Sequence, residues 1–136
     1  PGRSHFMAAL IARAAAAMQA GDRTFEVWGD PNTVRDLMYI ADQIEAIIAA
    51  DASLGNRIVN CTSNQPVTIG ACARAIVDAL GWDAILMHPS DSFQGTAVKS
   101  LDSTEFLTAT GWRPRIGLAD GISRVLVSDF AKGRLP

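Results

Sequence analysis

The most constraining feature of this sequence is an alternation of helical segments with short apolar runs. Residues 4–20 are expected to form a helix that Ser4 caps and Gly21 ends, and residues 68–80 one that Thr68 caps and Gly81 ends. The further expected helices are 41–50, a short one from Asp102 or Ser103 to Gly111, and 118–132. The expected strands are 25–28, 35–40, 57–61, 84–87 and, more briefly, 98–101. This order predicts an α/β or α+β lobe, with a small mixed sheet and several helices.

The size and charge of the chain restrict the class of protein to which it can belong and the partners it can bind. Its 136 residues suit one domain, 1–136, and 49% hydrophobic with 19% charged residues is typical of a soluble globular protein. The net charge of −2, without blocks of like charge, does not indicate a nucleic-acid or anionic-membrane partner. The apolar stretch 6–20 is too short to cross a bilayer, and Arg13 interrupts it.

The two cysteines, Cys61 and Cys72, match no metal-ligand spacing and are too few for a disulfide framework. We therefore expect two reduced, mostly buried thiols in a cytoplasmic protein, and no metal.

Motifs for nicotinamide cofactor binding and hydride transfer are absent from the sequence. No glycine-rich turn of the G-x-x-G-x-x-G or G-x-G-x-x-G kind joins a strand to a helix. The sole tyrosine, Tyr39, is not followed by a lysine four positions later. We therefore expect no turnover from this chain alone.

Two cationic residues are candidates for binding an anionic ligand. Arg35 follows a Gly/Pro/Asn turn, and its planar guanidinium can hold diphosphate oxygens in a bidentate manner. The alternative is a surface ion pair with Asp36 or Asp30. Lys99 follows a polar loop and can hold a phosphate or a sugar hydroxyl, or it is an ordinary solvated lysine.

Two ring-bearing residues have chemistry that suits a site. Trp28 offers a flat apolar face to a sugar or base, although a tryptophan at a strand end is as often part of the core. His5 begins a helix, where an imidazole can exchange a proton near neutral pH. The alternative for His5 is a structural or solvated histidine.

Four stretches together resemble the extended short-chain dehydrogenases that act on nucleotide sugars, which form the NAD-dependent epimerase/dehydratase family. The first is Val27-Trp28-Gly29-Asp30 with the later Arg35-Asp36-Leu37-Met38-Tyr39-Ile40-Ala41-Asp42. The second is Ile58-Val59-Asn60 with Thr68-Ile69, where Cys61-Thr62-Ser63 replaces the family's glycine. The third is Gly95 to Asp102, with Leu107 and Gly111-Trp112-Arg113-Pro114. The fourth, Ser4 to Ile11, is similar to a motif of the GDP-L-fucose synthase branch.

The resemblance implies a specific role for the chain and for seven of its residues. The chain would be the C-terminal, nucleotide-sugar-binding domain of a two-lobe enzyme whose Rossmann half is absent here. That half would bind NADP(H) and supply the Ser, Tyr, Lys and Cys of the chemistry. In this lobe Arg35 and Lys99 would hold the diphosphate, and His5 would be the acid of epimerisation. Phe6, Leu10 and Trp28 would line the nucleotide pocket, and Arg13 would reach a phosphate.

The implied substrate is GDP-4-keto-6-deoxymannose, and the intact enzyme would be a homodimer. Two alternatives stay open. One is a lobe of another nucleotide-sugar 4-epimerase or 4,6-dehydratase, which would not need His5. The other is a stand-alone, non-catalytic binding or interaction module.

Overall fold

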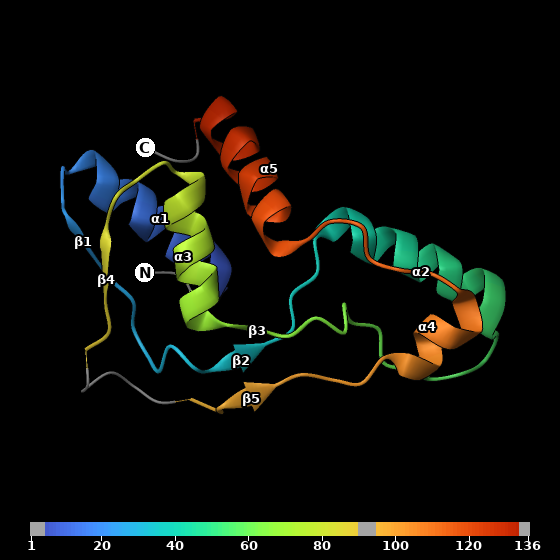
Figure 1. Cartoon of the computed structure of the whole chain (residues 1–136). Coiled ribbons are helices and arrows are strands. Elements are labelled where there is room, and N and C mark those ends of the chain that lie inside the picture. Colours follow the sequence, from blue (N-terminus) through green and yellow to red (C-terminus); the bar gives the residue numbers. More distant parts are fainter. Residues whose placement is uncertain (1–4, 90–94, 134–136) are drawn as a thin grey trace.

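The predicted α/β class is confirmed by a computed structural model, which describes residues 5–89 and 95–133. Helices and short strands alternate along the chain, and the helices make up most of the regular structure (Figure 1). In chain order the elements are α1 (Phe6–Gln19), β1 (Thr24–Glu26), β2 (Val34–Arg35), α2 (Ile40–Leu54), β3 (Val67–Thr68), α3 (Ile69–Ala79), β4 (Ile85–Met87), β5 (Val98–Lys99), α4 (Thr104–Thr110) and α5 (Leu118–Ala131).

The strands form two small sheets. β1 pairs with β4 in parallel, and a second sheet has the order β3-β2-β5. In that second sheet β2 is antiparallel to β3 and parallel to β5, with Arg35 opposite Lys99. The pairing therefore brings together two cationic residues that lie far apart in the sequence.

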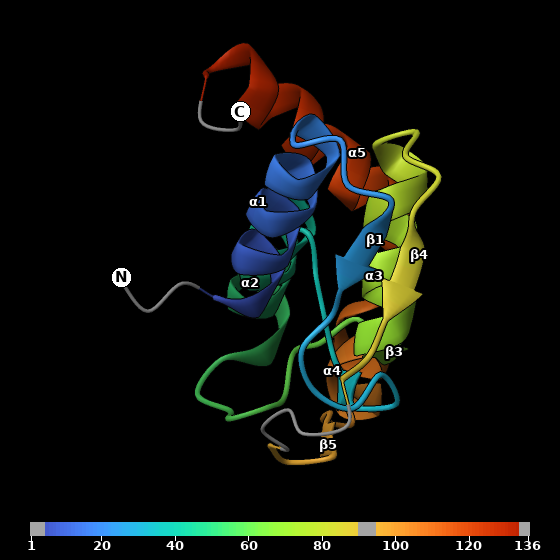
Figure 2. The same ribbon diagram turned by 90° about the vertical axis from the view of Figure 1, so that its left-hand side faces the viewer.

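The main hydrophobic core lies where α1, α3 and α5 meet the β1–β4 pair (Figure 2). Leu10, Phe25, Ile76 and Leu126 are among its buried members. A smaller cluster lies between α2 and α4, where Phe106 packs against Trp112 with ring centroids 5.8 Å apart. Figure 1 shows the α2–α4 pair extending away from the other three helices.

The predicted caps and stops of α3 are confirmed. The Oγ1 of Thr68 accepts a hydrogen bond from the backbone N–H of Ala71 at 3.1 Å, which caps the first turn. Gly81 follows the helix with a φ of +64°, a conformation that glycine adopts without strain. α1 begins at Phe6 with His5 in the cap position, and the proposed cap Ser4 lies outside the described residues.

Two predicted strands differ in the structure. Residues 57–61 form no strand, because side chains rather than a backbone ladder hold this part of the chain. Asn60 Nδ2 donates to the carbonyl of Asp102, and the Thr62 N–H donates to Ser103 Oγ. The predicted strand 35–40 is reduced to Val34–Arg35, and the chain continues irregularly to the start of α2.

Phe6 is 36% exposed, and the buried face of α1 consists of Leu10, Ile11, Ala14 and Ala15. The predicted start of α4 is confirmed: Ser103 occupies the cap position, and the Asp102 carboxylate accepts from the Thr104 N–H at 2.8 Å. In the described part of the chain, no helix has both the length and the apolar character needed to cross a membrane.

Candidate functional site

Five of the seven predicted site residues line one cavity of about 380 Å³. This first cavity lies between the start of α1, the turn after β1 and the strand β2. Its lining residues are Phe6, Ala9, Leu10, Arg13, Trp28, Gly29, Asp30, Thr33, Arg35, Ile69 and Gly95. The fold thus gathers four separate stretches of sequence around one space.

Arg13 and Trp28 form one wall of the first cavity. The guanidinium of Arg13 lies 3.8 Å from the centroid of the Trp28 ring and donates to the carbonyl of Glu26 at 2.6 Å. Trp28 Nε1 donates to the Glu26 carboxylate at 2.6 Å, which fixes the ring from its edge. Burial lowers the pKa of Arg13, yet a guanidinium stays charged at neutral pH. Trp28 is still 63% exposed, so part of the ring is open to a ligand.

Arg35 on β2 also lines the first cavity. Its Nη1 donates to the carbonyls of Val34 at 2.7 Å and of Thr96 at 3.0 Å. The ion pairs with Asp36 or Asp30 considered from the sequence are not observed among the described residues. Asp30 instead accepts from the Asn32 N–H at 2.8 Å.

Lys99 and His5 lie near the first cavity but do not line it. Lys99 is exposed and pairs in register with Arg35 across β2 and β5. His5 is exposed and directly precedes Phe6, a lining residue. Leu10 lines the cavity but is only 6% exposed, so its side chain belongs chiefly to the core.

Sequence reasoning missed the role of Asp36, the neighbour of Arg35. Its Oδ1 accepts from the Ser63 hydroxyl at 2.7 Å, and its Oδ2 accepts from the Ser100 hydroxyl at 3.2 Å. The Asp36 N–H also donates to the Lys99 carbonyl at 3.2 Å. Asp36 therefore ties the loop before β3 and the end of β5 to β2. The alternating charge of Arg35-Asp36 was visible in the sequence, but the partners of Asp36 were not.

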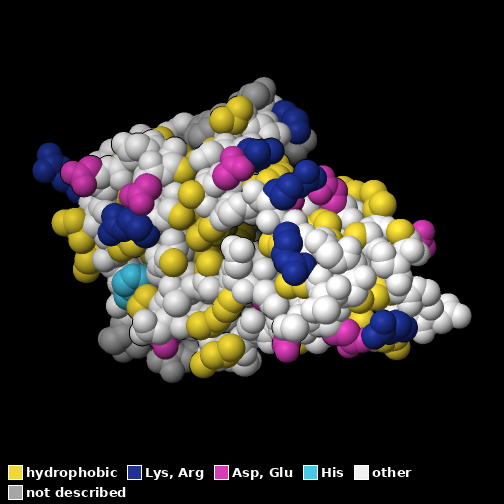
Figure 3. Space-filling view, turned by 45° about the vertical axis from the view of Figure 1, so that its right-hand side comes forward, with side chains coloured by type: hydrophobic (Ala, Val, Ile, Leu, Met, Phe, Trp, Pro, Cys, Tyr) yellow, Lys and Arg dark blue, Asp and Glu magenta, His cyan; other side chains and the backbone are white. Residues whose placement is uncertain are grey.

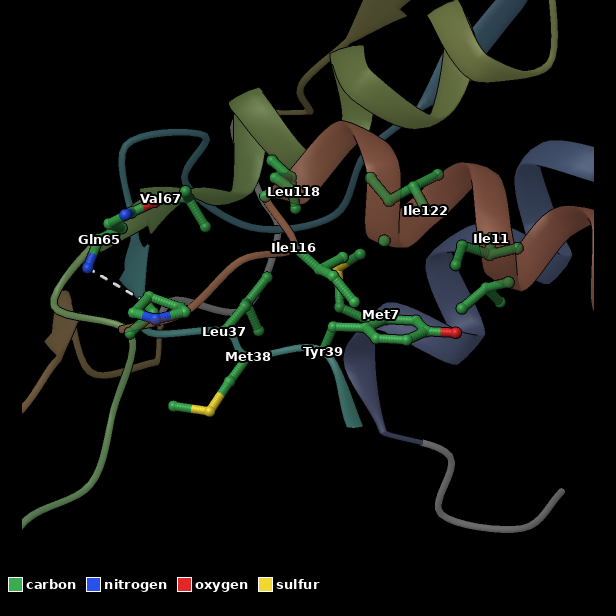
Figure 4. Close-up of a pocket in the computed structure, with 15 residues that line it drawn as sticks. Met7, Ile11, Leu37, Met38, Tyr39, Gln65, Val67, Ile116, Leu118 and Ile122 are labelled. Carbon is green, nitrogen blue, oxygen red and sulfur yellow. Dashed lines mark hydrogen bonds between the residues drawn. The ribbon is translucent and has the colours of Figure 1, made fainter. Parts of the chain in front are cut away.

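A second cavity of about 300 Å³, also missed from the sequence, lies between α1, α5 and the segment before α2 (Figure 4). It is mainly apolar. Its lining residues are Met7, Ile11, Leu37, Met38, Tyr39, Ser63, Gln65, Val67, Pro114, Ile116, Gly117, Leu118, Gly121, Ile122 and Val125.

The described residues do not fit a dinucleotide cofactor. Such a site needs a glycine-rich turn and free N–H groups at a helix start. At the β3–α3 junction the Gly70 N–H already donates to the Pro31 carbonyl at 2.9 Å, and a Cβ on Gly70 would lie 3.2 Å from Pro31 atoms. Nor does the described part of the chain contain a cluster of three or more metal-ligating side chains.

Comparison with known sequences agrees with this architecture. Residues 1–62 match the NAD dependent epimerase/dehydratase family. GDP-L-fucose synthase 1 of Arabidopsis thaliana is 31% identical over 125 residues, which cover 91% of this chain and 38% of that protein. The UDP-glucose 4-epimerase of Mycolicibacterium smegmatis is 29% identical over 125 residues, covering 90% of this chain and 39% of that protein. The chain therefore spans about two fifths of the length of these relatives.

Solved structures share the fold. A GDP-L-fucose synthetase from Naegleria fowleri superposes with a TM-score of 0.85 at 16% identity, covering 96% of this chain and 40% of that one. The NADP-bound form of that synthetase gives a TM-score of 0.80. The similarity to the NAD-dependent epimerase/dehydratase family and its GDP-L-fucose synthases that the motifs predicted is thus confirmed, and the chain shares the fold of the matching part of these structures.

Proposed function

We propose that this chain is the nucleotide-sugar-binding lobe of an NADP(H)-dependent epimerase/reductase of the GDP-L-fucose synthase type. The observation that supports it most directly is the first cavity, where Phe6, Arg13, Trp28 and Arg35 converge. A nucleotide sugar presents a flat base, a diphosphate and hydroxyl groups. The exposed part of Trp28 suits the base, and the two cations, Arg13 and Arg35, suit the diphosphate.

In this proposal each residue has a distinct task. Arg35 and Lys99 face each other across paired strands and hold the diphosphate. To do so, Arg35 exchanges its hydrogen bond to the Thr96 carbonyl for phosphate oxygens, which form stronger, charge-assisted bonds. Phe6 and Trp28 contact the base or the sugar. His5, at the start of α1, donates or accepts a proton during epimerisation.

The cofactor enters the proposal only through the other lobe. Because the described residues offer no dinucleotide site, NADP(H) and the groups for hydride transfer would belong to the Rossmann half. This chain positions the sugar, excludes water around it and supplies His5. Positioning of this kind accounts for much of the rate in two-lobe enzymes. The intact enzyme is proposed to be a cytoplasmic homodimer that acts without a metal.

Calorimetric titration of the 136-residue chain with GDP, UDP and dTDP sugars tests the proposal. We expect saturable binding with a preference for GDP sugars. Arg35→Ala should weaken binding, whereas Arg57→Ala, which removes an exposed ion pair with Glu105 in another part of the fold, should not. Equal weakening by both variants, or no binding of any nucleotide sugar, would rule out the proposed site.

A second candidate function is supported by the similarity to a UDP-glucose 4-epimerase. A lobe of that kind would use the same cavity for a UDP sugar and would not need His5. A titration in which UDP sugars bind more tightly than GDP sugars would favour this candidate.

A further inference from the structure

Glu26 and Trp28 project from the same side of the strand β1 and the turn that follows it. Glu26 is the last residue of β1 and lies opposite Met87 of β4. The Val27 N–H donates to the Met87 carbonyl at 2.8 Å, so the extended backbone continues past the end of the strand. Successive side chains of an extended backbone point to opposite sides. Val27 is therefore fully buried, whereas Glu26 and Trp28 are exposed on the other side.

Two hydrogen bonds join Glu26 to the wall of the first cavity. Its Oε1 accepts from Trp28 Nε1 at 2.6 Å, and its backbone carbonyl accepts from Arg13 Nη2 at 2.6 Å. The Arg13 guanidinium lies 3.8 Å from the centroid of the Trp28 ring. The indole thus has its one N–H donor committed to Glu26 and one face covered by Arg13. The three side chains therefore hold one another in place.

The Glu26 carboxylate forms no ion pair with Arg13 or any other part of the chain that the structure describes. Elsewhere a carboxylate beside an arginine does so, as Glu105 with Arg57, and Figure 3 shows acidic and basic side chains interspersed over one face of the molecule. At Glu26 the carboxylate instead accepts from the neutral indole N–H, while Arg13 donates to the carbonyl of the same residue. Burial lowers the pKa of Arg13, and the charge of Glu26 partly offsets that effect. The directed bond of the Glu26 carboxylate is therefore the one to Trp28.

The orientation of Trp28 matters for binding, because 63% of this residue is exposed and an exposed ring without a partner rotates freely. A ligand that stacks on a freely rotating side chain has to immobilise it. That ordering reduces affinity by about 2- to 12-fold for one side chain. A ring that is already held in the right orientation avoids this loss.

We propose that Glu26 is a positioning residue of the first cavity, whose carboxylate holds the indole of Trp28 in the orientation in which the base of a nucleotide stacks on it. This inference rests on the proposed function. Glu26 is not among the residues that line the cavity, so it acts through Trp28 and not on the ligand. Because the indole N–H is committed to Glu26, the ring offers the base a face and no donor, which suits purines and pyrimidines alike. Glu26 therefore sets the affinity for a nucleotide and not the choice of base.

The first part of the test measures the binding of GDP and of UDP to the 136-residue chain by calorimetry. Glu26→Ala should weaken the binding of both by about 5- to 10-fold, because Trp28 loses its partner. Glu26→Gln should bind within about twofold of the parent, because an amide oxygen also accepts from the indole N–H. The matched control Glu105→Gln removes the same charge outside the cavity and should leave affinity unchanged. Melting temperatures should stay nearly unchanged, since both glutamates are exposed.

The second part is a double-mutant cycle with Trp28→Phe, which distinguishes positioning of the ring from a general structural role. Phenylalanine keeps a stacking ring but has no N–H, so Glu26→Ala should change affinity by less than about twofold in that background. An equal loss from Glu26→Ala in both backgrounds, or parental affinity in Glu26→Ala itself, overturns the proposal. Equal weakening by Glu26→Gln and Glu26→Ala also overturns it, because the charge and not the bond would then matter.

The same titrations distinguish failure of this proposal from failure of the proposed function. A chain that binds UDP more tightly than GDP and still shows the coupling between Glu26 and Trp28 contradicts only the GDP-L-fucose synthase type of function. A chain that binds GDP without that coupling contradicts only the positioning role. A chain that binds neither nucleotide overturns both.

Discussion

The guanidinium of Arg13 stacks on the indole of Trp28 at 3.8 Å while donating a hydrogen bond to the Glu26 carbonyl. A stacked cation and a charged hydrogen bond each contribute on the order of 1 kcal/mol. The pair also fixes one wall of the first cavity. The role of Arg13 in this structure is therefore to orient Trp28, in addition to any contact with a phosphate.

Arg13→Ala is expected to lower the free energy of unfolding by about 1–2 kcal/mol and to weaken nucleotide-sugar binding. Arg13→Lys should recover only part of the loss, because an ammonium lacks the planar stacking face. Thermal denaturation and calorimetric titration measure the two effects. The matched control is Arg74→Ala, an exposed arginine on α3. Wild-type stability and affinity in Arg13→Ala would show that Trp28 needs no support.

Asp42 anchors the chain segment that leads into α5. Its side chain is 1% exposed, and its Oδ2 accepts from the N–H groups of Arg115 at 2.9 Å and Ile116 at 2.8 Å. Asp42→Ala leaves both donors without a partner, so we expect a loss of about 2–4 kcal/mol of stability. Asp51→Ala, at an exposed position of the same helix, should change stability by less than about 0.5 kcal/mol. Urea denaturation of the two variants provides the comparison, and similar midpoints would contradict the anchoring role.

Sequence signals that depend on neighbouring residues predicted most of the fold. The elements that they predicted wrongly depend on pairing with residues far along the chain. The Thr68 cap and the Gly81 stop depend on neighbouring residues, so α3 was predicted nearly to its ends. Whether residues 35–40 form a strand depends on a partner that periodicity cannot identify. For 57–61, the competing side-chain bonds come from Asp102 and Ser103, far along the chain.

Most residues of the candidate site were likewise predicted from the sequence. Five predicted residues line one cavity because α1, the turn after β1 and β2 meet there. The spacing of the isoleucines of α2 places them on one face, but it does not indicate that this face stays exposed, as it does in the structure.

The two cysteines should differ in reactivity. Cys72 is fully buried in the main core, and its desolvation raises the pKa of the thiol to about 11. At pH 8 only about one molecule in a thousand then carries the reactive thiolate. Burial also raises the pKa of Cys61, but that side chain is only half-buried. Iodoacetamide should therefore modify Cys61 first and Cys72 only in denaturant, as peptide mass spectrometry would show. Faster labelling of Cys72 in the native chain would contradict the packing of α3.

The last prediction separates binding from chemistry and applies to the proposed two-lobe enzyme. Arg35 is proposed to hold the diphosphate, an interaction that is the same in substrate and transition state. His5 is proposed to transfer a proton, which matters only as the reaction proceeds. Loss of uniform binding raises KM, whereas loss of a transition-state interaction lowers kcat.

Arg35→Ala should therefore weaken substrate affinity by about 1.5–3 kcal/mol, the usual contribution of a charged hydrogen bond. His5→Asn should leave affinity nearly unchanged and slow epimerisation by about 10²–10⁴-fold. It should spare hydride transfer, because that step would depend on the other lobe. Deuterium wash-in at the carbons beside the ketone, measured together with NADPH oxidation, distinguishes the two steps. If His5→Asn exchanges deuterium and forms product at the parental rate, His5 is not the acid. The 4-epimerase or dehydratase assignment would then replace the synthase one, because neither of those reactions needs a proton from this position.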